Sequence, residues 1–115
     1  MANPNRGAVA VRVGDDEWTF SFSINALCEL EDCLGKPVPQ IVDALGDPAN
    51  LRMTDVRALV WAAMLDHHDG ISLKEAGDVA SKIGAILCLE KVGKALEIAF
   101  PPAKGMKENP RKTKG

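Results

Sequence analysis

Apolar and polar residues alternate strictly through the first part of the chain, in the run AVAVRVGDDEWTFSF. A period of two is typical of strands with one buried face, and a Gly-Asp-Asp segment between two such runs indicates a tight turn. The pattern therefore predicts a β-hairpin. The apolar face consists of valines before the turn and aromatic residues after it: Val9, Val11, Val13, Trp18, Phe20 and Phe22.

From Ser23 onward the apolar residues recur three or four positions apart, which is the spacing of a buried helix face. Ser23 or Asn25 can cap the start of the first helix, and Gly35 with a proline soon after it ends the helix. A short second helix is predicted over residues 39–45, because proline is tolerated in a first helical turn and a Gly-Asp-Pro turn signal follows. The apolar positions of the first helix are Ile24, Leu27, Leu30 and Leu34.

Three further helices follow from the same spacing. Thr54 is a candidate cap for a helix that ends near Gly70. Ser72 and Glu75 have the spacing of a capping box and open a helix that reaches Gly84. Two consecutive prolines end the last helix. Its apolar face is marked by Ile86, Leu89, Val92, Leu96 and Phe100.

These elements predict an α+β fold, an N-terminal two-stranded antiparallel β-hairpin followed by a bundle of four to five short helices, as a single domain over residues 1–100. The remaining segment, 101–115, lacks apolar periodicity and is predicted to be a basic, disordered tail. It contains five Lys or Arg and one Asp or Glu, whereas residues 1–100 contain nine and fifteen. An acidic body repels a phosphate backbone, so we expect no nucleic-acid partner.

The overall composition is that of a globular protein. Of the 115 residues, 46% are apolar and 26% are charged, far from the composition of disordered chains. No apolar run of about 18 residues is present to span a bilayer, and the N-terminus lacks the apolar segment of a secretory signal. These features predict a cytoplasmic protein without membrane contacts, whose three cysteines are reduced thiols.

No motif indicates a catalytic, metal or cofactor site. Cys28 and Cys33 lie about 140° apart around a helix, and neither has a histidine at a ligand spacing. His67 and His68 fall at a helix end, where exposed carbonyl groups favour histidine as a capping residue. The acidic run ELED between the cysteines is either a solvated helix face or a contact for a basic protein surface. We therefore expect no cofactor and no enzymatic activity.

Two features indicate contacts with other polypeptides. Residues 58–65 are all apolar, which places Trp61 and Leu65 opposite the main apolar stripe of their helix. Such a helix is either covered on all sides by its own domain or meets a partner with its second face. A two-stranded hairpin must pack on the helices through residues such as Trp18, and its outer edges stay open to strand addition. Trp18, Trp61 and Leu65 are thus the candidate partner-binding residues, for another protein or a second copy of the chain.

Several segments, in this order and spacing, resemble a family of small tail proteins of bacteriophages and gene transfer agents. They are NPNRGAVAVRVG, FSINALCELEDCLGKPV and MTDVRALVWAAMLDHHDGISLKEAGDV, followed by a helix that ends in Phe100. The resemblance covers residues 3–100. It implies that the cysteine-containing segment is the family's first helix, with shape and capping positions at Asn25, Leu27, Leu30, Glu31, Leu34 and Gly35.

The resemblance implies a non-enzymatic role in building a long tail, and two hypotheses follow from it. In the first, the chain is a cytoplasmic tail assembly chaperone that binds the tape-measure protein. In the second, it is a structural component associated with the tail tube and present in the virion. The sequence favours the chaperone, because tube subunits resemble large β-barrel rings whereas this chain is mostly helical.

Overall fold

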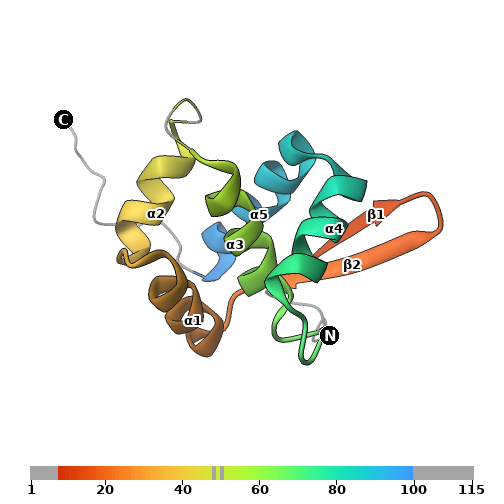
Figure 1. The fold of residues 1–115 in the computed structure, drawn as a ribbon, viewed down its shortest axis with the longest axis horizontal. Helices are drawn as coiled ribbons and strands as arrows, with labels where there is room; N and C mark the ends of the chain where they lie inside the picture. Colours follow the sequence, from red (N-terminus) through yellow and green to blue (C-terminus); the bar gives the residue numbers. More distant parts are fainter. Residues whose placement is uncertain (1–7, 48, 50, 100–115) are drawn as a thin grey trace.

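A computed structural model of the chain describes residues 8–47, 49 and 51–99. In this part of the chain a β-hairpin precedes five helices, which confirms the predicted α+β fold (Figure 1). The predicted basic tail over 101–115, and Phe100, lie outside the described residues. The elements in chain order are β1 (Ala8–Val13), β2 (Asp16–Ser21), α1 (Ile24–Leu34), α2 (Val38–Leu45), α3 (Met53–Met64), α4 (Leu73–Ile83) and α5 (Ala85–Ala99).

The hairpin forms where the alternating pattern predicts it. β1 and β2 pair antiparallel, with Val9 opposite Phe20 and Val11 opposite Trp18. Gly14, the first of the two turn residues, has a φ of +60°, the left-handed conformation that glycine supplies at that position of a type II′ turn. The alternation therefore places the valines and aromatic residues on one face. Val11 and Phe20 on this face are fully buried.

Local capping explains the limits of α1 and α4. The Ser23 hydroxyl accepts a hydrogen bond from the Ala26 N–H at 3.0 Å, and α1 ends at Gly35, which has a φ of +68°. At the start of α4, the Ser72 hydroxyl accepts from the Glu75 N–H at 3.1 Å, and the Glu75 carboxylate accepts from the Ser72 N–H at 2.9 Å. The predicted capping box is confirmed.

The predicted limits of α3 are wrong at both ends. The helix begins one residue before Thr54, since the Asp55 carboxylate accepts from the Arg52 N–H at 3.1 Å and supplies the capping interaction instead. It ends at Met64 rather than near Gly70. The backbone N–H groups of Leu65 and His67 donate to the carbonyls three residues before them, those of Ala62 and Met64, so tight turns interrupt the helical ladder at this point.

One residue of the predicted apolar face of α5 is also misplaced. The buried side of α5 is formed by Cys88, Val92, Ala95 and Leu96. Ile86 lies two residues before Cys88, a rotation of about 200° along a helix, which points its side chain away from the core. Its side chain is accordingly 82% exposed.

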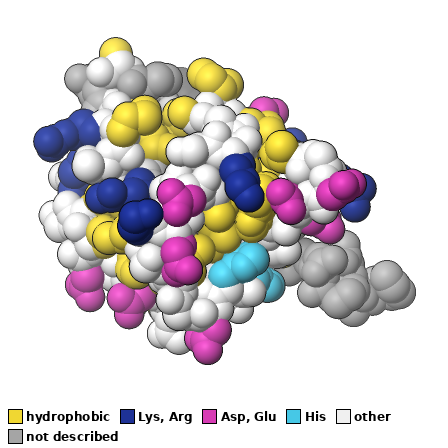
Figure 2. Space-filling model, turned by 45° about the vertical axis from the view of Figure 1, so that its right-hand side comes forward, with side chains coloured by type: hydrophobic (Ala, Val, Ile, Leu, Met, Phe, Trp, Pro, Cys, Tyr) yellow, Lys and Arg dark blue, Asp and Glu magenta, His cyan; other side chains and the backbone are white. Residues whose placement is uncertain are grey.

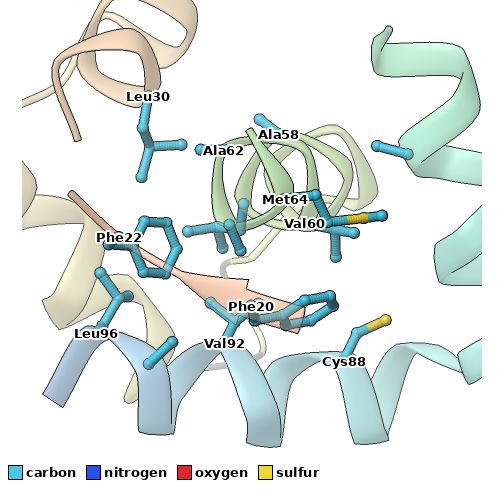
Figure 3. Packing of buried hydrophobic residues seen from close by; sticks show 14 of the residues in the cluster. Phe20, Phe22, Leu30, Ala58, Val60, Ala62, Met64, Cys88, Val92 and Leu96 are labelled. Carbon is cyan, nitrogen blue, oxygen red and sulfur yellow. The ribbon is translucent and has the colours of Figure 1, made fainter. Parts of the chain in front are cut away.

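Helix α3 lies at the centre of the domain and contacts α1, α4, α5 and β2. Phe20 and Phe22 fill the space between α3 and α5, and Leu30 of α1 packs near Ala62 (Figure 3). Of the two options for this helix, a helix covered by its own domain or one with a second face left for a partner, the first holds for most of its apolar residues. Those that are buried are Val56, Ala58, Leu59, Val60, Ala62, Ala63 and Met64, whereas Trp61 is half-buried.

Candidate interaction surfaces

The three candidate partner-binding residues do not form one surface. Trp61 is half-buried, packs against the core, and donates its indole N–H to the Ile71 carbonyl at 3.0 Å. This bond ties the segment after α3 back onto the helix. Leu65 is half-buried at the C-terminal cap of α3. Because each keeps some exposed surface, their role in partner binding stays a prediction.

Trp18 lines a shallow hollow of about 420 Å³ between β2, the segment after α3, and α4. The hollow offers a histidine and two carboxylates but no hydroxyl or thiol nucleophile among its lining side chains. The residues that line the hollow are Trp18, Met64, His68, Asp69, Gly70, Ile71, Glu75 and Val79.

His68 is held in an environment that disfavours its charged form. Its Nε2 atom is buried and has no hydrogen-bond partner. Burial lowers the pKa of His68 below its ordinary value of 6.5, and the neighbouring His67 lowers it further. The ring is therefore neutral at physiological pH. It is the backbone N–H groups of the two histidines that satisfy the carbonyl at the end of α3.

Asp66 joins the segment after α3 to the start of α1. Its carboxylate accepts hydrogen bonds from the Ser23 hydroxyl at 3.0 Å and from the Ser23 N–H at 3.2 Å. The same hydroxyl caps α1 through the Ala26 N–H. Asp66 thus orients the capping group across 43 positions of sequence, and no local pattern in the sequence signals this contact.

A serine, a histidine and an aspartate meet at this junction, but not as a catalytic triad. The Ser21 hydroxyl lies 3.0 Å from Nε2 of His67 and 3.5 Å from the Asp66 carboxylate. In a triad the carboxylate accepts from the second nitrogen of the histidine ring. Among the described residues no hydrogen bond joins Asp66 to His67. The cluster therefore connects β2, α1 and the end of α3.

The cysteines are dispersed. Cys28 and Cys33 are exposed on α1, whereas Cys88 is buried, with its sulfur 3.8 Å from the Ala80 carbonyl. Burial raises the pKa of the Cys88 thiol to about 11, which keeps it protonated and unreactive. Within 8–47, 49 and 51–99, no three His, Cys, Asp or Glu side chains lie close enough to hold a metal ion.

A mainly apolar opening lies between α3 and α4, and we call it the α3–α4 groove. Its volume is about 440 Å³. Met53, at its rim, is 64% exposed, and Ile86 follows directly after a lining residue. Figure 2 shows apolar side chains reaching the surface in patches between charged ones on one face of the molecule. The groove is lined by Met53, Thr54, Val56, Arg57, Gly77, Ala80, Ser81, Gly84 and Ala85.

The shape of this groove depends on small residues of α4. A Cβ atom added at Gly77 would lie 3.2 Å from Cδ of Arg57, so the arginine stem crosses α4 at the glycine. The individual residues are visible in the sequence, but their juxtaposition across two helices is not. The groove is accordingly the surface that the sequence pattern did not predict.

Comparison with known proteins identifies the family of the chain. A family model described as phage tail tube protein, GTA-gp10, matches residues 6–100. The chain belongs to this family. The predicted resemblance to phage and gene-transfer-agent tail proteins is thereby confirmed over almost the same range. Comparisons with curated proteins and with solved structures give no match.

Membership of the GTA-gp10 tail tube family identifies a tail protein whose contacts are with other tail proteins. The matched range includes every described strand and helix. Where the structure describes the chain, none of the helices is long and apolar enough to cross a membrane. The surfaces described above are therefore candidates for contacts with protein.

Replacing Asp66 with Ala should destabilise the fold by about 1–2 kcal/mol, because the Ser23 N–H and the capping hydroxyl lose a charged acceptor. Urea unfolding of both proteins measures the difference. The neighbouring Asp69, which is exposed, provides the matched control as Asp69→Ala. Equal stability of the Asp66 and Asp69 variants would contradict the assigned contact.

The neutral state of His68 predicts a pH-dependent stability. The unfolded chain takes up the proton near pH 6.5, whereas the folded chain does so only at lower pH. The contribution of His68 to the free energy of unfolding is therefore fully present above pH 6.5, and it is lost as the pH falls below 6.5 because only the unfolded chain then binds the proton. Between about pH 7.5 and about pH 5.5, the free energy of unfolding should decrease less in His68→Leu than in the wild type. A fall of the same size in both proteins would refute this role.

Proposed function

We propose that this chain is a non-enzymatic structural component of a phage-like tail, present in the finished particle and bound to other tail polypeptides. The observation that carries the proposal is the match of residues 6–100 to a family described as a tail tube protein. The chemistry of the described residues agrees with a binding role. The α3–α4 groove is lined mainly by small and apolar residues, and in the Ser21, His67 and Asp66 cluster the hydroxyl, not the histidine, is the group that meets the carboxylate.

The hairpin supports a role in assembly. The sheet has two strands among the described residues, so each strand keeps one backbone edge without a neighbouring strand. Figure 1 shows the turn of the hairpin extending beyond the helices. Unpaired strand edges accept a further strand from another polypeptide. A tail subunit can use these edges to join its neighbours.

A tail assembly chaperone for the tape-measure protein is the second candidate. It is favoured by the small sheet, since the two strands have only six residues each whereas helices form most of the described chain. The α3–α4 groove has apolar walls of the kind that accept the apolar side of an amphipathic helix. A chaperone of this kind would bind in the host cytoplasm before the tail is complete.

Mass spectrometry of purified particles separates the two candidates. If the chain is structural, its peptides should persist through particle purification at a constant ratio to those of the other tail proteins. Peptides that are abundant in lysed host cells but lost from finished particles would contradict the structural proposal. In that case, higher solubility of the tape-measure protein upon co-expression with this chain would support the chaperone.

A further inference from the structure

The outer side of α1 is a ridge that combines apolar and acidic side chains. Ile24, Cys28 and Asp32 are spaced four residues apart, which places them along one side of the helix. All three are exposed, and Ile24 is 78% exposed at the first position of α1. Glu29 is exposed beside them. We call these four residues the α1 ridge.

The acidic groups of the α1 ridge have no ion-pair or hydrogen-bond partner among the residues that the structure describes. The ion pairs among the described residues join Arg12 with Glu17, Lys74 with Asp78, and Lys82 with Asp16. None of them involves the ridge, and no hydrogen bond to its carboxylates occurs within the described part of the chain. The charges of the ridge are therefore free to pair with a surface of opposite sign.

The α3–α4 groove has the complementary character. Its only charged lining residue is Arg57, which is exposed and forms no ion pair with any described residue. The remaining lining residues are small or apolar, and Met53 adds an exposed side chain at the rim. An apolar surface with one unpaired cation fits a helix that presents an apolar side chain beside a carboxylate.

The two surfaces cannot meet within one molecule. Helices α1 and α4 both pack on α3 but make no contact with each other, and Figure 1 shows them on different sides of it. We propose that the α1 ridge of one copy docks in the α3–α4 groove of another copy. Ile24 and Cys28 then cover the apolar wall, and Asp32 with Glu29 lies beside Arg57.

The charges favour a second copy over the chain's own C-terminal segment. Residues 101–115 contain five Lys or Arg and one Asp or Glu, which gives this segment the same sign as Arg57 and the wrong sign for the groove. The ridge has the opposite sign and matching apolar side chains. Because the contact joins two different surfaces, it is head-to-tail, and repeating it generates a ring or an open filament.

This inference is independent of the proposed function. A head-to-tail contact serves a subunit of the finished tail and a chaperone equally well. If the chain proved absent from purified particles, the contact between copies could still form. If the copies proved not to associate through these surfaces, the chain could still be present in the particle. The two experiments therefore fail separately.

Two single variants and their mixture test the contact by analytical ultracentrifugation. Arg57→Glu reverses the charge of the groove, and Ile24→Glu removes the apolar anchor of the ridge at an exposed site. The wild type should form species larger than a monomer as the concentration rises towards about 1 mM. For each variant alone, the dissociation constant for self-association should be at least about tenfold higher than that of the wild type. Mixed in equal amounts, they should form a 1:1 dimer and nothing larger, because one intact groove and one intact ridge remain.

Matched controls and a second groove variant complete the test. Lys94→Glu and Ile98→Glu change exposed residues of α5 in the same way and should associate like the wild type. Met53→Glu replaces Arg57→Glu if circular dichroism shows that the latter is unfolded. A wild type that stays monomeric at about 1 mM, folded variants that associate like the wild type, or a mixture that stays monomeric would each overturn the proposal. A dimer of Ile24→Glu alone would indicate a symmetric contact and would also overturn it.

Discussion

The need to cover α3 is the constraint on which the rest of the structure depends. This helix is apolar around its whole circumference over residues 58–64, and such a surface is stable only when it is removed from water. The domain achieves this by placing α1, α4, α5 and β2 against it. Each of these elements must therefore direct its apolar side towards α3. The small side chains of Ala58, Ala62 and Ala63 allow the neighbouring elements to approach closely.

Covering α3 also determines which surfaces remain for partners. Because α1 and α4 pack on different sides of this helix and make no contact with each other, the outer side of α1 and the α3–α4 groove are separate surfaces. Ile24 and Met53 remain exposed on these two surfaces, whose charged groups form no ion pair with any described residue. The buried residues 58–64 of α3, Trp61 excepted, form the core of the domain, whereas the first turns of the same helix contribute Met53 and Arg57 to the α3–α4 groove. Trp61 also holds the segment after α3 in place through its hydrogen bond to the Ile71 carbonyl, and its role as a contact residue stays a prediction.

Features encoded by neighbouring residues could be predicted from the sequence, whereas those that depend on tertiary contacts could not. The alternation before and after Gly14 requires a hairpin, and the Ser72 capping box is complete within four positions, so both were predicted. The cap at Asp55 was missed because Thr54 is an equally suitable residue type one position earlier. Ile86 was assigned to the wrong side of α5, since the helix has apolar residues on more than one side. The α3–α4 groove depends on how two helices pack, which no local period specifies.

Native-state amide hydrogen exchange tests most directly whether α3 is the core on which the other elements depend. If it is, the amides of residues 58–63 exchange only through global unfolding, with an opening free energy equal to that measured by urea denaturation. The amides of α1, α2 and α4 should exchange through smaller openings that leave α3 folded. Faster exchange in α3 than in α1 or α4 would contradict the central claim.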